Sequence, residues 1–167
     1  LILKLKDLGF TLVLATMTTQ VQLDIYSKKN KKMYEQMNIE EVFDLIIRKE
    51  DVKNKKPNPE IYNKIIQYYN ATPEECLIFE DSYTGVLAGN SAGIEVINVY
   101  DKYADVDRDK INSIIDYSIT DYKQFIDLDI ILILITLAGA LVFYDLSQCT
   151  SRLISGSALM EKEMTKP

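Results

Sequence analysis

Short apolar segments alternate along the chain with longer segments in which apolar and polar residues recur at helical spacing. The apolar segments have the composition of buried strands, and they are Phe10 to Ala15, Leu45 to Ile47, Leu77 to Phe79, Glu95 to Val99 and a short piece at Tyr117 to Ile119. The intervening pattern predicts helices over residues 1–8, 20–43 and 60–69, from shortly after Asp81 to Gly93, weakly around 111–115 and over 121–126, with a polar loop over 101–109. Alternating strands and helices predict an α/β fold with a parallel sheet.

Two of the predicted strands end in polar side chains. The strand ending at Ala15 is followed by Thr16, Met17, Thr18 and Thr19, and the strand ending at Phe79 is followed by Glu80 and Asp81. Open parallel sheets place their ligand sites at the carboxyl ends of the strands. Adjacent carboxylates there suit a hard cation such as Mg²⁺.

A third polar feature is the segment Lys55-Lys56-Pro57-Asn58-Pro59-Glu60. Its prolines exclude helix until Pro59, which suits the start of the helix that follows. The pattern therefore predicts that Lys56 lies on a stiff loop just before a helix.

Composition limits the chemistry. A chain of 167 residues can bury one ordinary core, so one domain with an appendage is expected. The net charge of −6 argues against a nucleic-acid partner. The absence of histidine excludes Ser-His and Cys-His catalysis, and two cysteines form no disulfide framework, which fits a reduced, cytoplasmic setting.

Thr16, the Lys56 segment and the sequence E-D-S followed by Gly85, Ala88 and Ala92 occur in an order that closely resembles the haloacid dehalogenase (HAD) superfamily, in its phosphatase and β-phosphoglucomutase-like branch. The resemblance covers residues 1–127 and implies the Rossmann-like parallel sheet of that core. It implies a small phosphorylated substrate and Mg²⁺ as the cofactor.

The same resemblance assigns roles to residues. Thr16, with Met17 beside it, would bind the transferring phosphoryl group, and Lys56 would neutralise it. Asp81 would coordinate Mg²⁺ directly, and Glu80 would support the metal through water. Taken singly, each residue also has an ordinary structural interpretation, such as a strand-end threonine, a solvated lysine or a helix cap. Their joint spacing favours the functional interpretation.

The chain departs from the family pattern at its start. The family's first motif, D-x-D-G-T on the central strand, supplies the nucleophile, and the cap domain that encloses the substrate follows it; neither is found before Thr16. We therefore expect a sheet that lacks its N-terminal central strand, with unpaired neighbouring strands that cost about 1 to 3 kcal/mol per buried group. A marginally folded chain without phosphatase activity, active only with a complementing N-terminal segment, is the expected consequence.

The tail over residues 128–167 is atypical for the family. Its apolar run, 130–144, is shorter than the roughly 20 residues that span a bilayer, so membrane insertion is possible but not favoured. One interpretation is an unrelated extension with an unstructured polar end. A sharper one is that Gly139 to Ser147 imitates the missing central strand and places Asp145 where the nucleophile belongs, as in a circular permutation. Asp127 and Asp129 also spell D-x-D, but no strand precedes them.

Two function classes result. The first is a HAD-type phosphatase or phosphohexomutase, inactive as this chain alone. The alternative is a non-catalytic remnant or a membrane-tethered phosphate-binding domain.

Overall fold

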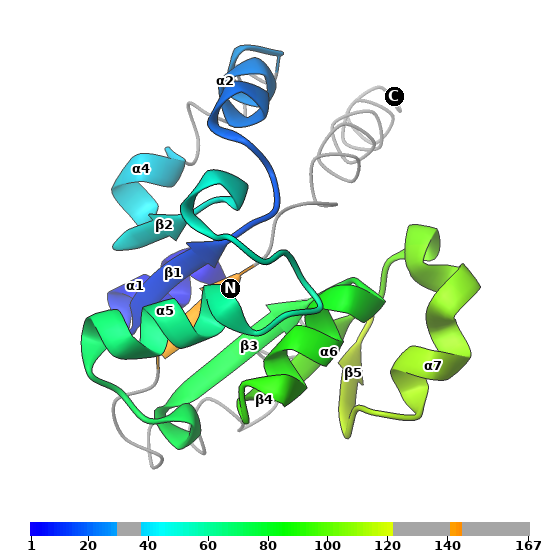
Figure 1. Ribbon diagram of the computed structural model, residues 1–167. Helices are drawn as coiled ribbons and strands as arrows, with labels where there is room; N and C mark the ends of the chain where they lie inside the picture. The colour runs from blue at the N-terminus through cyan, green and yellow to red at the C-terminus, as the bar shows by residue number, and fades with distance from the viewer. Residues whose placement is uncertain (30–37, 122–140, 145–167) are drawn as a thin grey trace, which may run out of the picture.

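The computed structural model describes residues 1–29, 38–121 and 141–144, and its strands form a single parallel sheet (Figure 1). The strands are β1 (Thr11–Ala15), β2 (Leu45–Ile47), β3 (Cys76–Glu80), β4 (Glu95–Val99), β5 (Tyr117–Ile119) and β6 (Leu141–Tyr144). The helices are α1 (Ile2–Asp7), α2 (Gln20–Lys29), α4 (Ile39–Val42), α5 (Glu60–Tyr69), α6 (Tyr83–Ser91) and α7 (Arg108–Asn112), with 3₁₀ turns η1 (Lys49–Asp51), η2 (Pro73–Glu75) and η3 (Lys102–Asp107).

The strand order is β2-β1-β6-β3-β4-β5, and all neighbours run parallel. If β6 is counted as the first strand, this is the doubly wound order 3-2-1-4-5-6 of Rossmann folds. The expected fold class, a Rossmann-like parallel sheet, is confirmed. The sheet is a circularly permuted version of that order, because its central strand comes last in the chain.

The expectation of an unfilled centre is wrong. Strand β6 lies between β1 and β3 and pairs with both, so that Phe143 is aligned with Val13 on one side and with Ile78 on the other. The proposal that the segment from Gly139 to Ser147 imitates the central strand is therefore confirmed for residues 141–144. Asp145 itself lies outside the described residues, as do Asp127 and Asp129.

Two apolar clusters cover the two faces of the sheet because successive strand residues point to opposite sides. One cluster packs against α1 and α4, and its members include Leu5, Leu12, Leu14, Leu77 and Phe79. The other packs against α5, α6 and α7, the first two of which lie in front of the sheet in Figure 1, and it includes Val13, Ile61, Ile78, Val86, Ile111 and Phe143. All the members named are at most 2 % exposed.

Local signals set several element ends as expected. Gly9 follows the end of α1 with a φ of +86°, and Asn70 ends α5 in the left-handed region with a φ of 50°. The segment from Thr72 to Glu75 forms a capping box in η2 immediately before β3.

Three local expectations were wrong. The helix expected over 20–43 does not run through to its end, because Asn38 accepts a hydrogen bond from the backbone N–H of Glu40 and starts the separate helix α4. The loop expected over 101–109 forms η3 and the start of α7, since Asp101 caps η3. Tyr68 was expected on the packed face of α5, but it is 68 % exposed while Tyr62 is buried.

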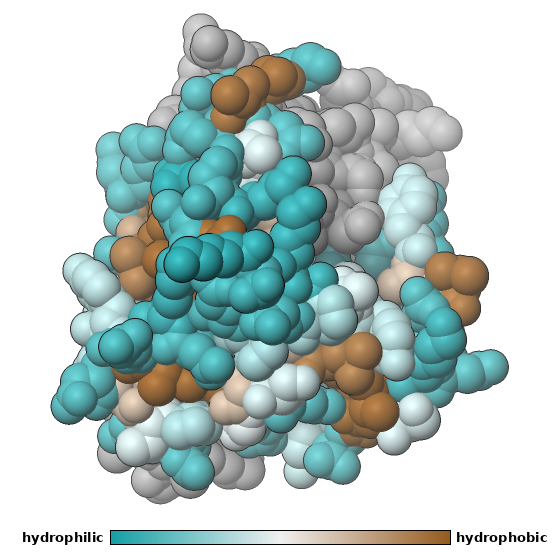
Figure 2. Space-filling model, in the orientation of Figure 1, coloured by the Kyte–Doolittle hydropathy of each residue, from teal (hydrophilic) through white to brown (hydrophobic). Residues whose placement is uncertain are grey.

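The boundary predicted between residues 127 and 128, the helix predicted over 121–126 and most of the tail lie outside the described residues. Strand β6 belongs to the tail and is nevertheless part of the same sheet. The side of the molecule in Figure 2 is largely hydrophilic, and its hydrophobic areas are small and separate. Scattered areas of this kind are normal on a protein surface.

Candidate active site

Polar groups gather where β1 and β3 end, on either side of β6. Thr16 follows β1, is fully buried, and its Oγ1 accepts a hydrogen bond of 3.0 Å from the backbone N–H of Thr18. Met17 is half-buried and packs against the cluster beneath α5 and α6. Strands β1 and β2 extend the sheet on one side of the boundary between β6 and β3, and β4 and β5 extend it on the other side. Doubly wound folds bind their ligands at such a switch point.

Lys56 is brought from its loop into this edge, with 9 % of the residue exposed. Its Nζ donates to Glu80 Oε2 at 2.9 Å and to the backbone oxygen of Ala15 at 3.3 Å, so the ammonium group lies beside the residue that precedes Thr16. The peptide bond between Lys56 and Pro57 is cis. The lysine is therefore buried and paired, which is the opposite of a solvated surface lysine.

Glu60 holds the loop that carries Lys56. Its two carboxylate oxygens accept hydrogen bonds of 2.8 Å from the backbone N–H groups of Lys53 and Asn54. These bonds, with a further one from the Asn54 side chain, lower the pKa of Glu60 from its ordinary value. The glutamate of the K-K-P-N-P-E segment thus acts as a clamp on the loop.

Glu80 is 1 % exposed, and both of its carboxylate oxygens accept hydrogen bonds. Oε2 accepts from Lys56 and, at 3.2 Å, from the hydroxyl of Tyr62, whereas Oε1 accepts from the Ser82 hydroxyl at 2.6 Å. A Cβ atom added at Gly85 would lie 1.9 Å from Glu80 Cδ. The close approach of α6 to this carboxylate explains why a glycine stands at that position.

Sequence reasoning missed Tyr62. Its ring lies 4.9 Å from the Lys56 ammonium and 5.9 Å from the ring of Phe143 on β6. Nothing in the pattern of α5 distinguishes this tyrosine from Tyr68 or Tyr69, so no local signal could have found it.

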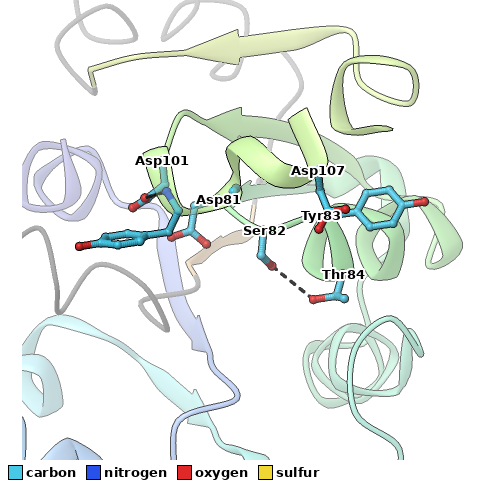
Figure 3. Close-up of a pocket in the computed structure, with 8 residues that line it drawn as sticks. Asp81, Ser82, Tyr83, Thr84, Asp101 and Asp107 are labelled. Carbon is cyan, nitrogen blue, oxygen red and sulfur yellow. Dashed lines mark hydrogen bonds between the residues drawn. The ribbon is translucent and has the colours of Figure 1, made fainter. Parts of the chain in front are cut away.

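Asp81 opens onto a cavity of about 140 Å³ beside the start of α6 (Figure 3). The cavity is also lined by Ser82, Tyr83, Thr84, Asp101, Tyr103, Ala104 and Asp107. Asp81 is 8 % and Asp101 is 2 % exposed, and they lie close to each other in Figure 3. Asp101 was not singled out from the sequence, although it follows the strand Glu95 to Val99 and the same strand-end rule would have found it.

The donor set of this cavity fits Mg²⁺. Within residues 1–29, 38–121 and 141–144, no group of three or more His, Cys, Asp or Glu side chains is placed to hold a metal ion. Magnesium, however, is commonly held by one or two carboxylates together with water and the phosphate of the substrate. Asp81 and Asp101 can supply such carboxylates, and Ser82 and Thr84 add hydroxyl oxygens.

Cys76 is excluded as a nucleophile. It lies inside β3 with 5 % exposure, and burial, followed by the nearby Glu75 and Glu74, raises the pKa of its thiol to about 12. The thiolate that a nucleophilic cysteine requires is therefore almost absent at neutral pH.

Buried hydroxyl, ammonium and carboxylate groups thus lie at the switch point of a doubly wound α/β sheet. Residues 1–99 match the family of haloacid dehalogenase-like hydrolases, and the chain belongs to this family. Strand β6 lies outside the matched residues.

Curated relatives are phosphatases or related proteins. The chain is 38% identical over 92 residues to a phosphorylated carbohydrates phosphatase from Thermotoga maritima. The aligned residues cover 55% of this chain and 39% of the relative. It is 30% identical over 125 residues to protein CbbY from Rhodobacter capsulatus, covering 74% of this chain and 49% of the relative.

The fold has solved counterparts. The structure of CbbY from Rhodobacter sphaeroides in complex with xylulose-(1,5)bisphosphate matches with a TM-score of 0.60 and 25% identity, covering 73% of this chain and 51% of that chain. This chain thus spans about half the length of the relatives it matches, or less. No helix among the described residues is long and apolar enough to cross a membrane.

Proposed function

We propose that this chain carries the phosphoryl-binding and metal-binding part of a phosphatase or phosphohexomutase site that acts on a small phosphorylated sugar. The observation that carries the proposal is the buried Lys56 ammonium, held between Glu80 and the carbonyl that precedes Thr16. The sugar substrate is supported by the phosphorylated carbohydrates phosphatase and by the CbbY complex with a sugar bisphosphate.

Each residue then has a physical role. Phosphoryl transfer depends mainly on fixed positive charge and hydrogen-bond donors around the phosphoryl oxygens. The Thr16 hydroxyl would donate to one of these oxygens, with Met17 beside it, and the Lys56 ammonium would neutralise their charge. Because Lys56 is already held by Glu80 and Tyr62, little reorganisation would accompany substrate binding.

Asp81 would hold Mg²⁺ directly, and when bound the ion would neutralise charge on the phosphoryl group. Glu80 would contribute from the outer shell through water, since both of its oxygens already accept hydrogen bonds from Lys56, Tyr62 and Ser82. Glu80 would thereby couple the lysine side of the site to the start of α6.

The described residues place no aspartate directly after the central strand β6. Strand β1 is followed by hydroxyl side chains, and β3 ends at Glu80 and is followed by Asp81. The residue after β6 lies outside the described residues. We propose that the chain alone binds inorganic phosphate and Mg²⁺ without turnover and that a complementing segment supplies the aspartate.

The test combines binding and hydrolysis. Isothermal titration of the full chain with inorganic phosphate is expected to show binding that Lys56→Met removes, whereas the exposed Lys29→Met control keeps it. Absence of phosphate binding to the unaltered chain would refute the proposed phosphoryl-binding site. Hydrolysis of a generic phosphomonoester that Asp145→Asn abolishes would refute the lack of turnover and identify Asp145 as the nucleophile.

A further inference from the structure

Asn98 is a fully buried polar residue in β4, whose other buried residues are apolar. It is aligned with Glu80, the last residue of β3. Burying an amide is costly unless its donors and acceptors are hydrogen-bonded, so its position calls for a specific set of partners.

Both the nitrogen and the oxygen of the Asn98 side-chain amide form hydrogen bonds. Its Nδ2 donates to the backbone oxygen of Glu80 at 2.9 Å, and its Oδ1 accepts from Arg108 Nη1 at 3.0 Å and from the Ser118 hydroxyl at 3.3 Å. The guanidinium group lies 4.6 Å from the ring centre of Tyr100, which holds it from another side. The orientation of the amide is thus determined by the two donors that reach Oδ1.

Arg108 also reaches a second strand end. Its Nη2 donates to the backbone oxygen of Asp101 at 2.9 Å. The backbone oxygen of Glu80 belongs to the peptide group that leads into Asp81, so one network holds the main chain at Asp81 and Asp101, two of the three acids that line the cavity. Figure 3 shows these two acids close together.

We infer that Asn98 and Arg108 are positioning residues that set the separation of the Asp81 and Asp101 carboxylates for a single divalent cation. This inference rests on the proposed metal-binding function. Outer-shell hydrogen bonds orient metal ligands, and losing one typically weakens metal affinity by about 10- to 100-fold. The network holds the main chain at Glu80 and Asp101, so we expect it to act on the metal side of the site and not on the phosphate side.

The experiment measures two affinities on the full chain by isothermal titration: Mg²⁺ alone, and inorganic phosphate without Mg²⁺. The variants are Asn98→Ala, Asn98→Asp and Arg108→Gln, with Asn112→Ala on the exposed side of α7 as the matched control. Asn98→Asp keeps the acceptor for Arg108 and loses the donor to Glu80, so it separates positioning from folding. A thermal melt in EDTA verifies that each variant is folded.

The expected result is Mg²⁺ affinity reduced about 10- to 100-fold in Asn98→Asp and Arg108→Gln, with phosphate affinity and the Asn112→Ala control unchanged. Unchanged Mg²⁺ affinity, or equal losses for Mg²⁺ and phosphate, would overturn the inference, because the second outcome indicates a general structural role. If the unaltered chain binds phosphate but no Mg²⁺, the metal part of the proposed function fails as well. The titration of the unaltered chain with Mg²⁺ therefore distinguishes failure of the proposed metal site from failure of the positioning role of Asn98 and Arg108.

Discussion

Replacing Phe143 with alanine tests whether β6 is the structural centre of the sheet. Phe143 is fully buried, is aligned with Val13 and Ile78 on the neighbouring strands, and packs its ring 5.9 Å from that of Tyr62. The substitution removes an entire aromatic side chain from between two strands and a helix, where the surroundings can collapse only in part.

The expected loss is about 3 to 5 kcal/mol of the free energy of unfolding, the usual range for a buried phenylalanine. A single domain has a total stability of about 5 to 15 kcal/mol, so the loss amounts to at least about a fifth of the free energy of unfolding. Phe143→Leu keeps most of the volume and is expected to lose less than about 1.5 kcal/mol.

Urea unfolding followed by far-UV circular dichroism gives these free energies by linear extrapolation. Val21→Ala on α2 is the matched control, because Val21 is 66 % exposed and its loss is expected to remain within about 0.5 kcal/mol. If Phe143→Ala is no more destabilising than this control, β6 does not occupy the centre of the sheet and the reasoning is refuted.

Three further predictions concern the rest of the fold. Gly85→Ala forces its new Cβ atom onto the carboxyl group of Glu80, 1.9 Å away, so we expect a loss of about 1 to 3 kcal/mol in urea unfolding; full stability would show that α6 shifts freely. The pKa of Asp44 is lowered in the folded state. Burial alone would raise this pKa, but hydrogen bonds from Lys6 and a strand N–H outweigh burial. Asp44→Asn should therefore cost stability at pH 7, and this difference should fade as the pH falls below about 4 and through the lowered pKa; a difference that persists at pH 2 contradicts the assignment. Because its pKa is raised to about 12, Cys76 should resist a thiol reagent at pH 8 until urea unfolds the chain, and rapid labelling of the folded protein, in a variant without the other cysteine, would disprove this.

The strands and the site acids were predictable because their signals are local. Short β-branched runs, the capping box at Thr72 and the acids that follow Phe79 are visible in a few consecutive residues. The end of the helix expected over 20–43 was missed for the opposite reason, since an asparagine cap at residue 38 competes with an otherwise helical pattern.

The partners of the site residues were less predictable. Tyr62 and Asn98 become part of the site through tertiary contacts, including those to Glu80, which lies 18 residues away from each of them in the chain. The sequence does not specify the partners at either position, because hydrogen bonding there depends on packing across the sheet.

By itself, the sequence determined the α/β class, the strand ends that carry Thr16, Glu80 and Asp81, and the stiff loop of Lys56. Only the tertiary structure decided that the apolar stretch at 141–144 becomes the central strand. An apolar run specifies that a segment is buried, but it does not specify which strands it will pair with. The position of β6 depends on its two parallel neighbours, β1 and β3, because β6 pairs with the backbone of both and packs against their apolar side chains.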